Sequence, residues 1–499
     1  MITPRFNIDQ TETDLIFTIQ APYASIADAE IYADLDTFCF YASPYYLRVH
    51  LSGHIEETDA SKGSYDADNG TFTICVQKVN KGEHFQDLDF LTALLTPNQS
   101  KKHDLSRPVV EVISNENLDS VEEDCSDGES NEWYIEQCPY EEPSEAFLLS
   151  APHYGFANKI SGAFQNFKTE FLEVIDLPDP DQTPISERSK LRTERELEDF
   201  SDDHYLADWA QPDIIEPMLT FKALWENGSE ASFLDDEKDV LKDLPKKEFL
   251  LDKREEHMVS LSLIDILYSY AYNVRSTMGE NTVESAWAVN KLSGTLSWLT
   301  SFNTLKEVVI VAVRRSLCYP LYRHWDLSMK VLDDVKRILT LGKKQILKSL
   351  LELHALFSNS EPRYILNQLY IRDYCIWIQH VSDSFLKSLL VAINKVELSK
   401  ADVALDLEEL ETAARLVQME EEASKIIHKN KSEELICREI SSLIISKDNT
   451  DGSRSSSGTS DSEDDSSSSD NDDSSSSSSS ESDLDSDDLS DIEPNITAV

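Results

Sequence analysis

The spacing of apolar residues changes once along this chain, from a period of two to the period of a helix, and that change limits the folds open to it. Four runs within the first 95 positions alternate apolar with polar residues: 15–19, 38–40, 47–51 and 72–76. Such alternation is typical of half-buried strands. Asp68-Asn69-Gly70 predicts a hairpin, because Asn-Gly readily adopts the positive φ angles of a tight turn. We therefore predict an antiparallel β-sandwich over residues 1–95.

From about residue 151 to 430 the apolar spacing is helical. Residues 259–274 carry apolar side chains on more than one face, which is typical of a helix in the middle of a core. Further helices are expected over 327–338, ending at Gly342, then over 346–357, from Pro362 onward, and over the charged residues 401–430. This part is predicted to be one large all-helical domain, so the fold class is multidomain, all-β plus all-α.

Two acidic segments flank the helical part. Residues 111–145 contain 13 Asp/Glu and no Lys/Arg, and residues 451–499 contain 15 Asp/Glu and one Arg. Such sequence has little to bury and repels itself. We predict a disordered acidic linker over residues 96–150 and a disordered Ser/Asp-rich tail over residues 431–499.

The overall charge indicates the kind of partner. With 94 acidic and 45 basic residues, the chain has a formal charge of −49, which opposes non-specific attraction to nucleic acid phosphates. A basic partner is expected instead. No apolar run approaches the roughly 18 residues needed to cross a bilayer, and the first residues lack an apolar signal region, so a soluble intracellular protein without membrane contact is expected.

Motifs of covalent chemistry are missing from the sequence. We find no phosphate-binding loop, no GxGxxG after a strand, no HExxH and no GxSxG. The seven cysteines include no CxxC pair, which predicts reduced thiols and neither a disulfide framework nor a zinc ribbon. The expectation is a binding protein that is not an enzyme and has no cofactor or metal.

Two polar residues have both a functional and a structural interpretation. His204 lies among aspartates and has the surroundings of a general base, but a helix start capped by one of the two preceding aspartates is favoured. Asp265 lies within an apolar helix and has the surroundings of a buried acid. The favoured interpretation is that it fixes helix register through its hydrogen bonds or pairs with Arg275 or Arg315.

Residues 314–325 interleave basic and aromatic side chains, a composition that suits stacking on RNA. The acidic charge of the domain favours another interpretation, a helix-turn-helix corner whose aromatic residues are core and whose arginines pair with acids. A role in binding a protein remains compatible with that corner.

The tail contains candidate phosphorylation sites. Ser460 and Ser462 are each followed three positions later by an acidic residue, the pattern favoured by acid-directed kinases. Each phosphate would add about −1.5 to −2 charges. A merely solubilising tail is the alternative, and the two do not exclude each other.

Several longer motifs occur in order over residues 1–430: MITPRF (1–6), GSYDAD (63–68), HYGF (153–156), DHYLAD (203–208), VESAW (283–287), CYPLYRH (318–324) and DYCIWIQ (373–379). With them the chain resembles the Shq family of H/ACA ribonucleoprotein assembly factors. The resemblance implies an N-terminal CS domain, the β-sandwich of p23 and small heat-shock proteins, followed by a family-specific helical domain.

The resemblance also implies a partner. This is the box H/ACA pseudouridine synthase, of the dyskerin or Cbf type, which the family holds before it joins its guide RNA. The helical domain would cover the RNA-binding face of the synthase as an RNA mimic, without binding nucleic acid itself. It further implies a monomer in the nucleoplasm and cytoplasm, and RuvB-like AAA+ proteins as an outside source of energy for release.

Partner-binding residues are predicted in three places: Asp202, Asp203, Tyr205 and Asp208; Arg314, Arg315, Tyr319, Tyr322 and Arg323; and, in the CS domain, Phe6, Gln10 and Lys78. The alternative, that the first two groups build the core of their own domain, is about equally good. Rival functions are a general Hsp90 co-chaperone of the p23/CS type, a direct RNA binder, and an enzyme whose site is assembled from distant residues.

Overall fold

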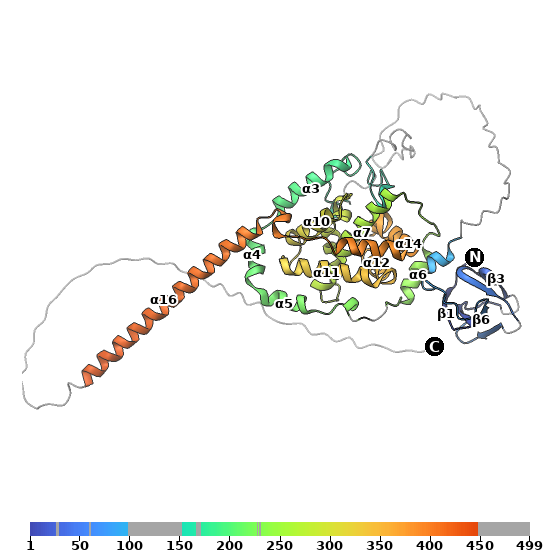
Figure 1. Ribbon diagram of the computed structural model, residues 1–499, viewed down its shortest axis with the longest axis horizontal. Coiled ribbons are helices and arrows are strands. Elements are labelled where there is room, and N and C mark those ends of the chain that lie inside the picture. Colours follow the sequence, from blue (N-terminus) through green and yellow to red (C-terminus); the bar gives the residue numbers. More distant parts are fainter. Residues whose placement is uncertain are drawn as a thin grey trace, which may run out of the picture. The chain divides into compact units, whose positions relative to one another are not determined.

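The computed structural model describes residues 1–25, 29–58, 61–97, 152–165, 171–226, 228 and 231–447. Strands come first and helices follow, as the two apolar periods predict (Figure 1). The predicted linker beyond residue 97, and the tail beyond residue 447 with Ser460 and Ser462, lie outside the described residues. Residues Met1–Glu421 form one compact unit and Glu422–Val499 a second.

Six antiparallel strands build the N-terminal domain: β1 (Arg5–Gln10), β2 (Asp14–Gln20), β3 (Glu30–Ala42), β4 (Tyr45–Glu56), β5 (Lys62–Asp66) and β6 (Thr71–Lys78). They pair in the order β1-β2-β6-β4-β3, with β5 also on β6. β4 meets β6 at only two residue pairs, so the sheet folds over there. The rings of Phe17 and Phe38 stack between the two layers at 3.8 Å. The predicted antiparallel sandwich is confirmed.

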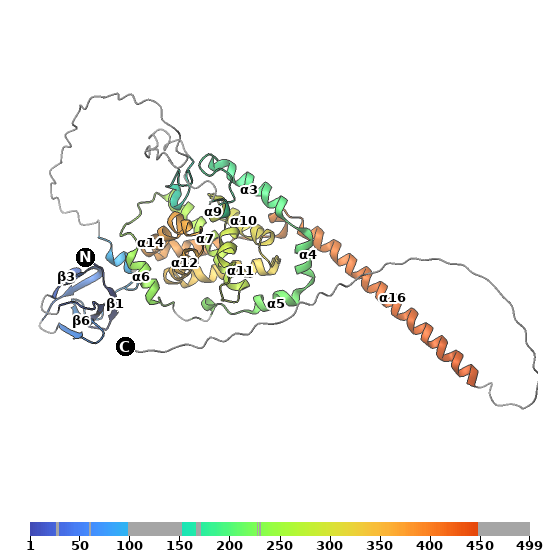
Figure 2. The ribbon, with the colours of Figure 1, turned by 180° about the vertical axis from the view of Figure 1, so that it is seen from behind.

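The remaining elements are helices. They are α1 (Leu91–Leu95), α3 (Ile185–Asp199), α4 (Asp202–Ala210), α5 (Pro212–Thr220), α6 (Asp235–Asp243), α7 (Lys253–Ser276), α8 (Ser285–Leu292), α9 (Gly294–Trp298), α10 (Leu305–Cys318), α11 (Trp325–Leu341), α12 (Lys343–Ser358), α13 (Tyr364–Leu366), α14 (Arg372–His380), α15 (Asp383–Ile393) and α16 (Leu407–Lys447). Figure 2 shows the same arrangement from behind.

Helix α7 lies in the middle of the helical domain (Figure 1). It begins at a capping box, in which the Asp252 carboxylate accepts the backbone N–H of Glu255 and the Glu255 side chain accepts that of Asp252. Its buried residues cover all sides of its second half, and it packs against α8, α10 and α11. The two apolar faces seen in the sequence therefore belong to a central core helix, as predicted.

The ends of the later helices follow their sequence signals, with one difference. Helix α11 ends at Leu341 and α12 begins at Lys343, on either side of Gly342 with φ 84°, as predicted. Helix α16 continues to Lys447, whereas the sequence placed its end near residue 430. Residues 431–438, KSEELICR, contain five strong helix formers (Lys, two Glu, Leu and Arg) and neither Gly nor Pro, so the helix-forming composition continues past that point. Within the described residues no helix is both long and apolar enough to span a bilayer.

Helix α1 connects the sandwich to the helical domain. The Thr92 hydroxyl donates to the Leu241 carbonyl at 2.6 Å, and the Ala93 backbone N–H donates to Gln379 Oε1 at 3.2 Å. Three ion pairs add to this contact: Arg5 with Asp239, Lys343 with Asp87, and Lys344 with Asp89. The sandwich and the helices therefore belong to one compact unit.

Candidate functional site

Two of the predicted partner-binding segments meet in space. The Asp208 carboxylate of α4 accepts the backbone N–H of Arg323 at 2.6 Å. His204 Nε2 lies 3.0 Å from the Leu321 carbonyl oxygen. More than a hundred residues separate these partners in sequence, so the fold brings together two groups of residues that the sequence analysis singled out separately.

The start of α4 differs in detail from the prediction. Its N-cap is Ser201, whose hydroxyl accepts the backbone N–H of His204 at 3.3 Å. Asp202 and Asp203 instead occupy the first turn, where a negative charge interacts favourably with the helix dipole. The prediction that one of these two aspartates is the cap is therefore wrong, and both carboxylates are left exposed to solvent.

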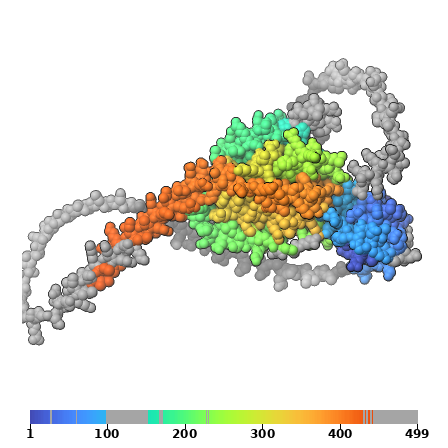
Figure 3. Space-filling view, in the orientation of Figure 1, coloured from blue at the N-terminus to red at the C-terminus, as the bar shows by residue number. Residues whose placement is uncertain are grey.

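Exposed carboxylates gather on three consecutive helices, α3 to α5. We define the acidic surface as Glu198, Asp202, Asp203, Asp213 and Glu216, together with the exposed apolar residues Leu197 and Ile214. Residues 200–220 contain five Asp/Glu and no Lys or Arg. Figure 3 shows α3 on the outside of the molecule. This surface offers both the charge and the apolar contact that a basic protein partner needs.

A buried cluster of arginines lies on the inner side of α3. The Glu196 carboxylate, which is fully buried, accepts hydrogen bonds from Arg192 at 2.8 Å, Arg314 at 2.9 Å and Arg315 at 2.9 Å. The Arg315 guanidinium also lies over the ring of Tyr319, at 4.7 Å from its centroid. Arg314 and Arg315 therefore hold α3 against α10, and their guanidinium groups are not exposed in this structure.

The face of α3 that packs inward is charged instead of apolar. Arg188, Arg192 and Glu196 follow one another at a spacing of four residues, and all three are buried. That spacing was the only signal in the sequence for Glu196. It was missed because a run of charged residues at helical spacing normally marks a solvated face.

The predicted tyrosines lie in or near the core. Tyr205 is fully buried, and its hydroxyl donates to the Glu411 carboxylate of α16 at 2.7 Å. Tyr319 and Tyr322 are half-buried, and the Tyr322 carbonyl accepts the hydroxyl of Tyr272 at 2.5 Å. Glu411 is a second residue that sequence reasoning missed, since it lies in an otherwise exposed charged helix. Among the predicted partner-binding residues, all of which lie in the described part of the chain, Asp202 and Asp203 are the exposed ones.

The three predicted residues of the CS domain make internal contacts. Phe6 is buried in the sandwich core. The Lys78 ammonium, also buried, donates to Gln10 Oε1 at 3.0 Å and to the carbonyls of Thr11 and Glu83 at 2.8 Å. Gln10 also bonds the backbone of Phe85 in both directions. These side chains fix the loop after β6, and a partner-binding role for them stays a prediction.

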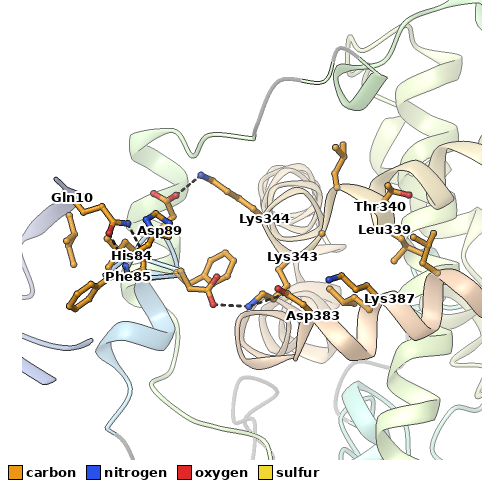
Figure 4. A pocket seen from close by; sticks show the side chains of 18 of the residues that line it. Gln10, His84, Phe85, Asp89, Leu339, Thr340, Lys343, Lys344, Asp383 and Lys387 are labelled. Carbon is orange, nitrogen blue, oxygen red and sulfur yellow. Dashed lines mark hydrogen bonds and ion pairs between the residues drawn. The ribbon is translucent and has the colours of Figure 1, made fainter. Parts of the chain in front are cut away.

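A charged cleft of about 710 Å³ lies where the loop after β6 faces α11, α12 and α15 (Figure 4). Its charged lining residues are Asp9, Asp87, Asp89, Lys343, Lys344, Asp383 and Lys387. Figure 4 shows Lys344 pointing toward Asp89, with which it pairs. Four aspartates face three lysines, and Lys343 and Lys344 pair with three of those aspartates, so the cleft carries charges of both signs and only a small acidic excess.

Asp265 meets in part the expectation that its hydrogen bonds fix the local structure: its Oδ2 makes two hydrogen bonds, whereas its buried Oδ1 has no partner among the described residues. It is fully buried and accepts the hydroxyl of Ser293 at 2.5 Å and the backbone N–H of Thr295 at 2.8 Å, which fixes the start of α9. Burial raises the pKa of Asp265, and Ser293 and Thr295 oppose the shift. No ion pair with arginine is seen in the described residues, because Arg275 and Arg315 pair with other carboxylates.

His324 provides a titratable cap next to α4. Its Nδ1 accepts the backbone N–H of Asp326 at 3.2 Å at the start of α11, which requires a neutral ring. Burial lowers the pKa of His324 below its ordinary value of 6.5, although Asp326, Asp208 and Glu411 oppose the shift. Because the pKa of His324 is lower in the folded than in the unfolded protein, the stability that its neutral ring contributes is fully present above pH 6.5. That contribution is lost as the pH falls through the folded pKa.

We therefore expect His324→Asn, which can cap without titrating, to reduce the loss of stability between pH 7.5 and 5.5. One such group changes the free energy of unfolding by at most about 1.4 kcal/mol per pH unit. Urea unfolding of both proteins at several pH values measures the slopes. Burial also lowers the pKa of His50, His354 and His380, so part of the slope remains in the variant. Identical slopes would show that His324 does not titrate in this range.

The described residues contain no group of three or more His, Cys, Asp or Glu side chains placed to hold a metal ion. The candidate site therefore consists of exposed carboxylates on α3 to α5 and of buried ion pairs on the inner side of α3.

Comparison with known proteins identifies both folded parts. Residues 3–95 match the model of the SHQ1-like CS domain, and residues 223–407 match that of the Shq1 domain of SHQ1 proteins. Helices α3 to α5 lie between the two matched ranges.

Several known proteins align with most of this chain. The Protein SHQ1 homolog of Xenopus tropicalis is 42% identical over 467 residues, which cover 91% of this chain and 75% of that protein. That of Mus musculus is 43% identical, covering 87% and 78%. Protein shq1 of Schizosaccharomyces pombe is 33% identical, covering 85% of this chain and 100% of its own length.

Proposed function

Because the chain belongs to the Shq1 family of assembly factors, we propose that it binds the box H/ACA pseudouridine synthase, of the dyskerin or Cbf type, before guide RNA is loaded. In this proposal it covers the RNA-binding face of the synthase as an RNA mimic, in the nucleoplasm and cytoplasm. The observation that carries the proposal is the acidic surface, because its carboxylates can take the place of RNA phosphates on a basic face.

The buried arginine cluster supports this reading of the acidic surface. Arg192, Arg314 and Arg315 each bind Glu196 on the inner side of α3 and so hold the helix firmly. The exposed side of α3 carries both charges, since Lys190 and Arg195 pair with acidic residues there, so the part of the acidic surface without Lys or Arg is that of α4 and α5. A surface that is fixed before binding loses less conformational entropy when the partner arrives. Since the sequence has no phosphate-binding loop, energy for release would come from RNA competition or from a partner ATPase such as the RuvB-like pair.

Reversing the charge of the acidic surface tests the proposal. We expect Asp202→Lys with Asp203→Lys and Asp213→Lys to weaken binding to the synthase about tenfold or more, mainly through slower association, and to reduce displacement of labelled guide RNA. Binding kinetics at two salt concentrations measure this, since screening should diminish the difference at high salt.

The matched control changes the net charge equally at another place. Glu12, Glu56 and Glu57 are exposed on the sandwich, and replacing all three with lysine also adds six positive charges. If both triple variants weaken binding to the same extent, the net charge and not the acidic surface is responsible. If the wild-type chain binds the synthase without displacing RNA, masking of the RNA face is wrong.

The CS domain supports a second candidate function, that of a general Hsp90 co-chaperone. The full chain and Hsp90, mixed with a non-hydrolysable ATP analogue, provide the test. Binding that is lost when the sandwich is altered and that needs no synthase would favour this alternative.

A further inference from the structure

Helix α16 continues past the residue that fixes it to the helical domain. Near its start, the buried Glu411 carboxylate accepts the Tyr205 hydroxyl of α4 at 2.7 Å and also pairs with Lys400 and Arg415. Over residues 412–427 every side chain is exposed except the half-buried Ala414. The helix therefore leaves the core at Glu411 and presents about four further turns to solvent.

A line of apolar side chains runs along this exposed part of α16. We define the helix stripe as Leu416, Met419, Ala423 and Ile426, which follow one another at spacings of three, four and three residues. Residues at these spacings share one side of a helix. The three large members are 58%, 64% and 60% exposed. Contiguous exposed apolar groups of this kind mark a site of interaction.

The helix stripe has the shape that a second helix needs. Its members form a single line, and the small Ala423 in the middle lets the axis of another helix come close. Helices that pack along such a line place the side chains of one between those of the other. Because a solvated helical segment is only marginally stable in water, a partner that covers the stripe also stabilises α16.

Glutamates flank the helix stripe. Glu420 lies four residues after Leu416, and Glu422 lies four residues before Ile426, so each is the neighbour of a stripe residue. Both glutamates are exposed. Lysines or arginines beside the apolar side chains of a partner helix would therefore pair with them.

The cations of the same part of α16 do not neutralise these edges. Arg415 lies four residues before Met419, but it pairs with Glu411 at 3.2 Å and lies over the Trp209 ring, 5.5 Å from its centroid. Lys425 lies two residues after Ala423, which places it on the other side of the helix. The edges of the helix stripe therefore remain acidic.

Charge also disfavours an occupant from this chain itself. A second copy would bring the same glutamates against one another and carries a formal charge of −49. Residues 111–145 and 451–499, with 13 and 15 Asp/Glu against no and one Lys/Arg, are acidic as well. Since like charges repel, a basic segment of another protein is the favoured occupant.

We propose that the helix stripe binds a basic amphipathic helix of a partner protein. The apolar sides of the two helices pack together, while lysines or arginines of the partner pair with Glu420 and Glu422. Because Glu411 holds the start of α16 against Tyr205 of α4, the contact continues from the acidic surface. Which protein supplies the helix rests on the proposed function, whereas recognition of a basic helix does not.

A synthetic peptide of three heptads, with leucine at positions a and d and lysine or alanine elsewhere, tests the proposal on the full chain. We expect the ¹³C-methyl NMR signal of Met419, assigned with Met419→Leu, to shift saturably, while those of Met258 and Met329 stay in place. Amide hydrogen exchange over residues 412–427 should slow. A peptide of the same composition, ordered so that its leucines form no line, should bind at least about tenfold more weakly.

Two neighbouring substitutions provide a matched pair. Leu416→Gln lies in the helix stripe, whereas Val417→Gln lies outside it, and the two side chains are 58% and 55% exposed. Glutamine favours helices, so both variants should fold. We expect Leu416→Gln to weaken peptide binding about tenfold and Val417→Gln to leave it unchanged within about twofold. Equal effects of the two, or an unmoved Met419 signal, would overturn the proposal.

Charge variants and sedimentation separate the basic helix from a second copy. Glu420→Gln with Glu422→Gln should weaken peptide binding and reduce its dependence on salt. A peptide with glutamate in place of lysine should not bind. Sedimentation velocity of the full chain should show no dimer that Leu416→Gln dissociates. Such a dimer would overturn the proposal, because a second copy would then cover the helix stripe.

The same variants distinguish this proposal from the proposed function. If Leu416→Gln weakens binding to both the peptide and the synthase, the synthase supplies the basic helix. If it weakens binding to the peptide alone, the assignment of the helix stripe to the synthase is wrong. If the wild-type chain binds the peptide but never the synthase, the proposed function is refuted and recognition of a basic helix stands.

Discussion

Glu196→Gln is expected to lower the free energy of unfolding by about 3–5 kcal/mol, the usual cost of breaking a buried ion pair from one side. The substitution keeps the shape of the side chain but removes the charge that Arg192, Arg314 and Arg315 share. The three guanidinium groups would then remain buried with too little negative charge. Urea unfolding followed by far-ultraviolet circular dichroism measures the difference between variant and wild type.

Glu198→Gln, on the same helix, is the matched control. Glu198 is exposed and pairs with Arg195 at 3.5 Å, so its loss should cost no more than about 1 kcal/mol. If both substitutions lower the free energy of unfolding equally, the buried charge of Glu196 stabilises the fold no more than the exposed charge of Glu198, and the prediction is wrong. A selective effect of Glu196→Gln should also weaken binding to the synthase, because α3 carries part of the acidic surface.

The buried cluster also shows where sequence reasoning reached its limit. The core helix α7 and the turn at Gly342 were predicted because apolar period and glycine are local signals. Glu196 was not, since its partners Arg314 and Arg315 lie 118 and 119 residues away. Pairing over such distances depends on how the helices pack, which no local pattern contains.

The candidate site was predicted in part. The segments around Asp203 and Arg323 were named as separate candidates, and the structure places them in contact. Their roles differ, because Asp202 and Asp203 of α4 are exposed, whereas Asp208 binds the backbone of Arg323 and Arg314 and Arg315 face inward. The formal charge of −49 had favoured arginines paired with acids over arginines free to bind RNA, and the ion pairs of Glu196 agree with that interpretation.

Arg275→Met should also lower the free energy of unfolding by about 3–5 kcal/mol. Arg275 is fully buried, and it binds the Asp334 carboxylate with two nitrogens, the Glu226 carboxylate at 2.6 Å and two backbone carbonyls. Methionine can fill much of the space but leaves Asp334 charged and buried. Lys330→Met is the control, because Lys330 reaches the same Glu226 only at 3.7 Å and is partly exposed, so it should cost at most about 1 kcal/mol.

A second substitution distinguishes the charge left behind from the loss of the backbone contacts. Adding Asp334→Asn to Arg275→Met removes the unpaired carboxylate, while the asparagine oxygen can still accept the indole N–H of Trp225, now bound at 3.1 Å. If the uncompensated charge causes most of the loss, the double variant should be clearly more stable than Arg275→Met alone. If it is no more stable, the hydrogen bonds of Arg275 to Met218 and Phe221 are responsible.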